Sequence, residues 1–230
     1  MTGKIEMKLK ILYEDNHLLA VAKPPGLPTM GVAAGKPSLL AAAKQYLKEK
    51  YDKPGNVYLG IVSRLDAPVT GVVLMARTSK AAARLTEQFR SGTVEKLYWA
   101  VVENQPEPAF GNCVDWVRKD ERHRRMHIAA ASHQDAKEAR LSYQTLRRVS
   151  AGWLVEVRLE TGRKHQIRLQ LSSRGWPIVG DRKYEARTRL AAGIALHSRQ
   201  LTFIHPVQKT EIQLVADVPS SWRTLGVRTR

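Results

Sequence analysis

Short runs of apolar residues, separated by turn-forming residues, organise the first third of the chain. Residues 10–13 and 17–22 predict two short strands joined by a tight turn. The continuous apolar run 72–76 predicts a buried strand. Residues 23–28 contain three prolines and a glycine, which exclude both a helix and a central strand. We therefore expect an extended loop there.

Two helices are predicted between and after these strands. Ser38 is a typical N-cap residue, and the pattern that follows it predicts a helix to about Lys50. Thr78 or Ser79 caps a second predicted helix, which ends at Gly92 because glycine favours the position just beyond a helix.

The rest of the chain is predominantly β in its pattern. A short helix over residues 164–174 interrupts a series of predicted strands, which cover 94–103, 139–149, 153–160, 195–204 and 210–216. Strands in runs with few helices predict an α+β fold with a large mixed, mainly antiparallel sheet. The chain shows neither a repeat nor a low-complexity linker, so we expect residues 1–230 to form a single domain.

Composition restricts the class of protein. Apolar residues make up 43% of the chain, but their longest runs are strand-sized and too short to span a membrane. The N-terminus lacks the apolar segment of a secretory signal. The single cysteine, Cys113, cannot form an internal disulfide or anchor a zinc site. We expect a soluble, cytoplasmic protein.

The charge balance indicates a polyanionic partner. The chain has 38 Lys and Arg against 21 Asp and Glu, a net charge of +17. Basic surfaces bind phosphates with release of counterions, and here the cations are spread among folded segments. A solvated basic surface or an acidic membrane face are the alternatives. The charge favours nucleic acid.

The segment Ser63-Arg64-Leu65-Asp66 is the first candidate for chemistry. Apolar residues precede it, and a proline and a glycine follow it before the next strand. A loop between two buried strands can project Arg64 and Asp66 into a cleft while Leu65 anchors it. The alternative is that Asp66 is a turn residue bonded to its own backbone.

The second candidate is the predicted strand-to-helix junction at residues 160–168. Free backbone N–H groups and the cations Arg163, Lys164 and Arg168 make an anion site plausible there. We expect His165 and Arg168 to lie on a helix stripe that faces a cleft. The alternative is a solvated basic helix start, although positive charge there opposes the helix dipole.

The third candidate is Tyr98, in a predicted strand where Lys96, Tyr98 and Ala100 share one face. An aromatic ring beside cations suits stacking on a nucleobase. A core tyrosine with a satisfied hydroxyl is the alternative.

The fourth candidate is the cation-rich segment 118–127, which includes Arg122, Arg124 and Arg125. Its composition suggests a mobile phosphate-binding loop. His123 and His127 are four residues apart, but they lack a third ligand, so we expect no metal site.

The chain resembles the RluA-type pseudouridine synthases, which convert uridine to pseudouridine in RNA. The resemblance runs in order from about residue 11 to residue 222. Six segments carry it: 11–28, with the loop K-P-x-G-L; Ser63-Arg64-Leu65-Asp66 with Val69-Thr70-Gly71; Lys96-x-Tyr98-x-Ala100; Thr161-Gly162-Arg163-x-His165-Gln166-Ile167-Arg168; 175–184; and Leu196-His197 with 201–206.

The resemblance implies a role for several residues. Asp66 matches the family's catalytic aspartate, Tyr98 the tyrosine that stacks on the target base, and Arg168 the partner of the catalytic carboxylate. Arg64 matches the arginine thought to fill the gap left by the flipped nucleotide. The remaining predicted substrate-binding residues are Arg163, Lys164, His165, Gln166, Arg122, Arg124 and Arg125.

The resemblance also implies the pseudouridine synthase fold with a central RNA-binding cleft. The substrate would be ribosomal or transfer RNA, and the isomerisation needs neither cofactor nor metal. We expect a monomer without the small N-terminal RNA-binding domain of some members, so that RNA recognition falls to the catalytic domain's surface.

Three departures from the family pattern bear on activity. Ser63 replaces a histidine, Val69-Thr70 replaces Thr-Ser, and Gln170 replaces the last histidine of the third motif. The rival hypothesis is a non-catalytic RNA-binding or ribosome-assembly protein that keeps the fold. A DNA-binding regulator is disfavoured because the sequence shows neither a helix-turn-helix nor a zinc-finger pattern.

Overall fold

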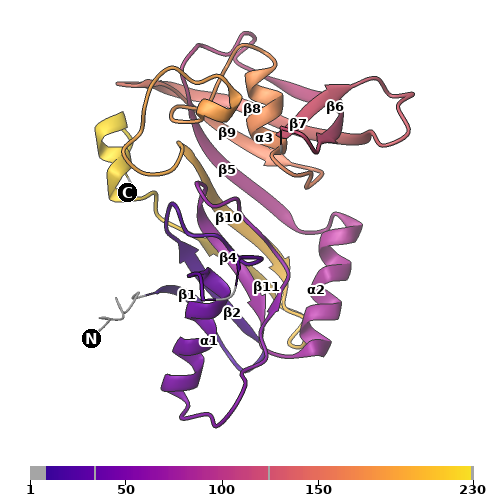
Figure 1. The fold of residues 1–230 in the computed structure, drawn as a ribbon, viewed down its shortest axis with the longest axis vertical. Helices are drawn as coiled ribbons and strands as arrows, with labels where there is room; N and C mark the ends of the chain where they lie inside the picture. Colours follow the sequence, from indigo (N-terminus) through magenta and orange to yellow (C-terminus); the bar gives the residue numbers. More distant parts are fainter. Residues whose placement is uncertain (1–8, 34, 124, 229–230) are drawn as a thin grey trace.

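One twisted sheet runs through the molecule (Figure 1). The computed structural model describes residues 9–33, 35–123 and 125–228, and within these residues eleven strands join in this sheet. The strand order is β1-β2-β4-β10-β5-β9-β8-β6-β7, with β11 paired to β10 and β3 paired to β4. Helices and loops pack on its faces, so the predicted α+β class with a mixed, mostly antiparallel sheet is confirmed.

The strands have the following bounds: β1 Lys10–Glu14, β2 Leu18–Lys23, β3 Gly60–Ile61, β4 Thr70–Ala76, β5 Glu95–Val102, β6 Phe110–Asp120, β7 Arg125–Ala129, β8 Lys137–Val149, β9 Gly152–Leu159, β10 Leu196–Ile204 and β11 Glu211–Val215. The α-helices are α1 Leu39–Lys50, α2 Ser79–Ser91 and α3 Gln166–Ser172, and the 3₁₀ helices are η1 Arg182–Tyr184 and η2 Ser220–Leu225.

The capping residues predicted for the first two helices are confirmed. The side chain of Ser38 accepts from the Ala41 amide at the start of α1, and Thr78 caps α2 in the same way. Gly92 closes α2 in the left-handed conformation, with φ of 78°. Local sequence signals therefore account for both helices.

Strands β2 and β4 are buried on both faces, which explains their continuous apolar sequences. On one face, Leu19 and Met75 pack with Leu39 and Leu47 of α1. The opposite face packs against α2 and the β10–β11 hairpin. This two-sided burial makes the N-terminal half of the sheet a rigid support for the loop that precedes β4.

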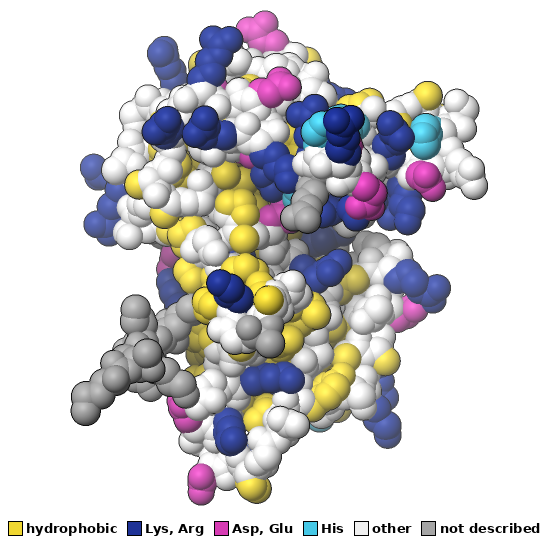
Figure 2. Space-filling model, viewed as in Figure 1, with side chains coloured by type: hydrophobic (Ala, Val, Ile, Leu, Met, Phe, Trp, Pro, Cys, Tyr) yellow, Lys and Arg dark blue, Asp and Glu magenta, His cyan; other side chains and the backbone are white. Residues whose placement is uncertain are grey.

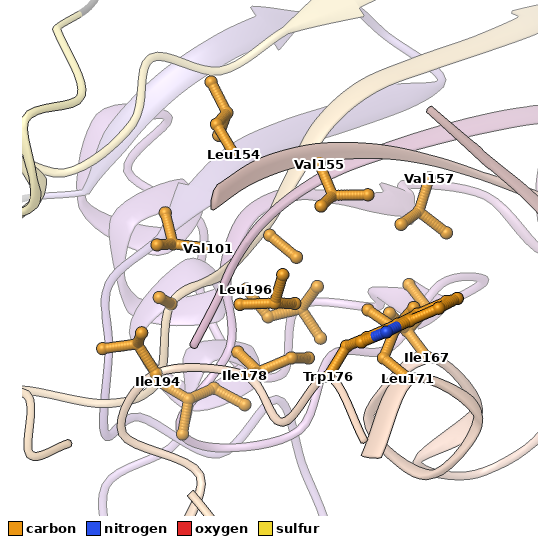
Figure 3. Close-up of a cluster of buried hydrophobic side chains, with 14 of the residues drawn as sticks. Val101, Leu154, Val155, Val157, Ile167, Leu171, Trp176, Ile178, Ile194 and Leu196 are labelled. Carbon is orange, nitrogen blue, oxygen red and sulfur yellow. The ribbon is translucent and has the colours of Figure 1, made fainter. Parts of the chain in front are cut away.

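A separate core holds the other half of the sheet together (Figure 3). Ile167 and Leu171 of α3 pack against Val155 and Val157 of β9, as expected from their spacing of one helical turn. Trp222 of η2 is buried in the same cluster. These contacts fix helix α3 on the sheet.

The two halves meet where β4 and β10 run parallel for only two residue pairs, Thr70 with His197 and Gly71 with Ser198. Ser198 is also paired with Tyr98 of β5. The start of β4 and the middle of β5 therefore lie on either side of β10.

The prediction of a mobile loop over residues 118–127 was wrong. Most of this segment belongs to an antiparallel hairpin in which Arg118 pairs with His127 and Asp120 with Arg125. Its few buried residues, such as Val117 and Met126, are outnumbered by exposed charged ones. The charged residues therefore masked a strand pattern that the pairing of β6 with β7 reveals.

Helix α3 is also shorter than the predicted span of 164–174. It begins at Gln166, two residues later than predicted, because His165 at the N-cap has a left-handed φ of 52°. None of the helices in the described part of the chain is both long and apolar enough to cross a membrane.

Gly71 is required for the contact between the two halves. Its φ is +112°, and a Cβ at this position would lie 2.2 Å from the carbonyl oxygen of Ser198. We expect Gly71→Ala to lower the free energy of unfolding by about 2 kcal/mol or more, measured by urea denaturation. Gly162→Ala is the control, since a Cβ there meets nothing within 4 Å. Equal stability of the two variants would contradict this explanation.

Candidate active site

The loop that carries Asp66 lies between β3 and β4 and is tied down from the proline-rich loop after β2. Thr29 is buried, and its hydroxyl donates to the Leu65 carbonyl at 2.8 Å and accepts from the Leu65 amide at 3.2 Å. The Nζ of Lys23 donates to the Ala67 carbonyl at 2.9 Å. The residues on both sides of Asp66 are therefore held in place.

Lys23 is a buried cation that joins two loops. Its ammonium group also donates to the carbonyls of Pro24 and Leu27, at 2.9 and 2.8 Å. Burial lowers the pKa of Lys23 to about 8, and the nearby charge of Asp66 opposes that shift. Three carbonyl acceptors satisfy the ammonium donors, as a buried charge requires.

Ser63 and Thr70, two departures from the family pattern, have structural partners. The hydroxyl of Ser63 accepts from the Leu74 amide at 2.8 Å and continues the pairing of β3 with β4. Thr70 bonds through its hydroxyl to Nδ1 of the buried His197 at 2.7 Å. Both residues brace the ends of the loop and do not contact Asp66.

Arg168 of α3 connects Asp66 to a second carboxylate. Its Nη1 donates to Oδ2 of Asp66 at 3.0 Å, while Nε and Nη2 bind Asp181 at 2.6 and 2.8 Å. Burial disfavours the charged guanidinium, but the bonds to Asp181 and Asp66 outweigh it and raise the pKa of Arg168. Arg168 therefore remains a fixed cation beside Asp66.

The two oxygens of Asp66 have different surroundings. Oδ2 accepts from Arg168 and lies 3.6 Å from Nε2 of His165. Within the described residues, Oδ1 accepts no hydrogen bond. The side chain is 28% exposed, so one oxygen is held by Arg168 while part of the carboxylate remains accessible.

His165 lies between Asp66 and Tyr184. Its Nδ1 is 2.8 Å from the Tyr184 hydroxyl. Burial lowers the pKa of His165 to about 4, the charge of Asp66 opposes this shift, and Arg168 and Lys164 reinforce it. The imidazole is therefore neutral at pH 7.

Tyr98 approaches the same place from β5. Burial raises the pKa of Tyr98 to about 12, a hydrogen bond with Ser198 opposes this shift, and the charge of Asp66 adds to it. The phenol therefore keeps its proton at neutral pH. The structure thus brings together Asp66, Tyr98, Arg168 and His165, which are far apart in sequence.

The other predicted binding residues differ in exposure. Arg64 and Lys164 are exposed, and Arg163 is exposed with its Nε donating to the Glu138 carbonyl at 2.8 Å. Gln166 is 3% exposed, and its amide group is bonded to Thr161, Arg163 and Arg140. Gln166 thus faces the protein interior and not the surface expected for substrate contact.

Cations of the β6–β7 hairpin border the site on a further side. Arg122 is exposed and Arg125 is half-buried, whereas Arg124 lies outside the described residues. His123 and His127 both bond to Oδ2 of Asp120, at 2.7 and 2.8 Å. Figure 2 shows Lys and Arg side chains around a hollow between the two halves of the molecule.

Sequence reasoning assigned no role to Asp181, Tyr184 or Lys23. All three lie inside segments that carry the family resemblance, so the resemblance could have pointed to them. Their partners are distant in sequence or are backbone atoms, so pattern alone could not identify them. The last motif residue, Gln170, is also buried, and it bonds to Asp115 and to backbone carbonyls away from Asp66.

Comparison with known proteins gives consistent results. A family model described as RNA pseudouridylate synthase matches residues 17–173, a range that contains Asp66, Tyr98 and Arg168. Ribosomal large subunit pseudouridine synthase D of Yersinia pestis is 34% identical, over 93% of this chain and 68% of its own length. An uncharacterised RNA pseudouridine synthase of Synechocystis sp. is 32% identical, over 96% and 69%. The solved structure of human RNA pseudouridylate synthase domain containing 4 has a TM-score of 0.78 and 27% identity, covering 96% of this chain and 94% of its own.

Acid should destabilise the fold through two buried imidazoles. Burial lowers the pKa of His165 and of His197 to about 4, from an ordinary value of 6.5. The unfolded chain binds more protons between these values, so the free energy of unfolding falls as pH drops from 6.5 towards 4, by about 2 kcal/mol per imidazole at pH 5. In urea denaturation at several pH values, His165→Gln should therefore lose less stability than wild type on acidification. Identical pH dependences would contradict the burial argument.

Proposed function

Because this chain belongs to the RNA pseudouridylate synthase family and is an RNA pseudouridine synthase, we propose that it isomerises specific uridines of ribosomal RNA with Asp66 as the catalytic carboxylate. The observation that supports this assignment most directly is the asymmetry of Asp66. One carboxylate oxygen is fixed by Arg168, the other accepts no hydrogen bond within the described residues, and the Asp66 charge is close enough to raise the pKa of Tyr98.

The reaction breaks the N1–C1′ bond of uridine and forms a C5–C1′ bond. The base gains a proton at N1 and loses the one at C5, so atoms balance without an oxidant or reductant. A carboxylate can act as nucleophile or base while the uracil detaches and reattaches. Arg168 keeps the Asp66 carboxylate oriented through Oδ2, which leaves Oδ1 available for the reaction.

The target base must leave its stack to reach Asp66, which costs a few kcal/mol. Tyr98 is suited to receive the flipped base, since its ring is presented from a rigid strand. Its protonated hydroxyl can donate a hydrogen bond. Arg64 is exposed two residues before Asp66, and we assign it to the space that the flipped nucleotide vacates.

Cations around the site supply the phosphate contacts in this proposal: the exposed Arg122, Arg163 and Lys164, the half-buried Arg125, and Arg124, which is added from the sequence. Gln166 receives a different role, because its buried amide holds the Thr161-to-Arg163 turn in place. The net charge of +17 supports RNA as the ligand.

The relatives support a ribosomal substrate. A ribosomal substrate is named for the synthase of Yersinia pestis, and transfer RNA is the second candidate from the sequence. Mapping pseudouridine in both RNA classes from cells lacking the protein distinguishes them. We further propose that the enzyme acts in the cytoplasm as a monomer, without cofactor or metal.

Catalysis should depend on Asp66, which also tests the rival hypothesis of a non-catalytic RNA-binding protein. With RNA tritiated at uridine C5, we expect Asp66→Ala and Asp66→Asn to release label at least about a thousandfold more slowly than wild type. Asp217→Ala is the control, because Asp217 is exposed and pairs with Lys10. RNA binding by the Asp66 variants should persist. Failure of the wild-type enzyme to release label from total cellular RNA would refute the proposed activity.

The hairpin cations should contribute to RNA affinity in a salt-dependent way. We expect Arg122→Gln combined with Arg125→Gln to weaken binding and to lower the slope of log K against log salt by about 1–2, measured by filter binding. The control is Arg223→Gln with Arg228→Gln, which removes the same charge from exposed positions at the C-terminal side, away from the hairpin (Figure 1). An unchanged slope in the hairpin variant would remove this hairpin from the RNA site.

A further inference from the structure

A chain of hydrogen bonds runs from the β6–β7 hairpin to the edge of the catalytic carboxylate. The Met126 amide of β7 donates to the hydroxyl oxygen of Tyr184 at 3.0 Å. That hydroxyl lies 2.8 Å from Nδ1 of His165. Tyr184 is 4% exposed and ends η1; its bond with Met126 is buried and its contact with His165 is partly buried.

The direction of the second bond follows from counting protons. A phenol has one hydrogen to donate, and Tyr184 already accepts from the Met126 amide. Its hydrogen therefore points to Nδ1 of His165, the other partner of the hydroxyl within the described residues. In this arrangement Nδ1 accepts and carries no proton, and the hydroxyl hydrogen has a partner.

The same imidazole is neutral, because burial lowers the pKa of His165 to about 4. A neutral imidazole with a bare Nδ1 carries its proton on Nε2. Nε2 is the nitrogen that faces Asp66, at 3.6 Å from Oδ2. This separation exceeds a normal hydrogen bond, so the N–H group is directed at the carboxylate without being engaged by it.

Two ring contacts hold Tyr184 in this position. The guanidinium of Arg168 lies over its ring, 5.0 Å from the centroid. The His165 ring meets it edge to face, with centroids 5.6 Å apart and an interplanar angle of 86°. Tyr184 therefore contacts both groups that surround Oδ2 of Asp66.

We propose that Tyr184 is a positioning residue that holds His165 in the neutral tautomer whose Nε2–H faces Asp66, and that links this geometry to the β6–β7 hairpin. The proposal rests on Asp66 being the catalytic carboxylate. His165 then offers Oδ2 a neutral donor in addition to the Arg168 cation, and this donor can stabilise negative charge there while Oδ1 reacts.

The link to the hairpin follows from the position of Met126. Its neighbours in β7 are Arg125 and His127, and Arg125 belongs to the surface that we assign to RNA phosphates. A displacement of β7 on RNA binding would change the bond from Met126 to Tyr184, and with it the orientation of His165. The state of the hairpin is thereby transmitted through two hydrogen bonds to His165, whose Nε2 lies 3.6 Å from the carboxylate.

The tautomer can be read directly and without activity. In protein labelled with ¹⁵N at histidine, we expect the His165 resonances, assigned with His165→Gln, to show an unprotonated Nδ1 and a protonated Nε2 at neutral pH. The imidazole is faced by Asp66, Arg168, Lys164 and Lys183, so the spectrum reports the balance of all four charges. A protonated Nδ1, in either the other tautomer or the imidazolium, would overturn the proposal.

Removal of one hydroxyl tests the role of Tyr184. Tyr184→Phe should shift His165 towards the Nδ1–H tautomer and lower kcat roughly tenfold, the usual effect of losing an orienting partner. Tyr143→Phe is the matched control, since Tyr143 is 6% exposed and its hydroxyl donates to the Pro108 carbonyl instead. An unchanged His165 spectrum in Tyr184→Phe would refute the assignment.

A double-mutant cycle separates positioning from a general structural role. Glutamine at residue 165 places an amide N–H near the position of Nε2 but has no tautomers. His165→Gln should therefore keep more activity than His165→Ala, and adding Tyr184→Phe to His165→Gln should not lower kcat further. A further tenfold loss would contradict the proposal. If Asp66→Asn remained active while the predicted tautomer was observed, the assignment of Asp66 would fail and the hydrogen-bond chain would stand.

Discussion

The guanidinium of Arg168 is buried between the carboxylates of Asp66 and Asp181, and the candidate active site is assembled around it. A buried charge is costly unless it is paired and its donors are satisfied, and the loss of one partner leaves an uncompensated charge. The ion group therefore requires the Asp66 loop, α3 and the segment before η1 to meet in one arrangement. Each of these segments comes from a different part of the chain, so the interaction couples the fold to the chemistry.

The sheet supplies the rigidity that this arrangement needs. Strands β4 and β10 pair at two positions only, with Gly71 against Ser198, and Tyr98 lies across the same residue. The Asp66 loop therefore starts and ends on strands whose faces are covered by helices. Lys23 and Thr29 then fix the loop from the opposite side through backbone atoms. The exposed cations around this loop can differ without disturbing the core.

Local signals were sufficient where neighbouring residues decide the structure. Ser38, Thr78 and Gly92 marked the helix ends because capping bonds join residues a few positions apart. The β6–β7 hairpin was missed, since its charged residues hid a strand whose pairing partner alone reveals it. His165 shortens α3 because its backbone is left-handed, a conformation that favours Gly and Asn. The residue type at this position therefore gave no sign that the helix begins later.

The sequence by itself determined the class of fold and the strong positive charge. Through its ordered motifs it also identified Asp66, Tyr98 and Arg168 as the candidate catalytic residues. These properties depend on composition, local periodicity and residue identity, all of which can be read along the chain. Only the tertiary structure decided that Asp181 shares Arg168 with Asp66, and that the Tyr184 hydroxyl accepts from the hairpin and lies within hydrogen-bond distance of His165. The physical reason is that a buried hydrogen bond depends on the distance and direction between two atoms, and sequence separation carries no information on either.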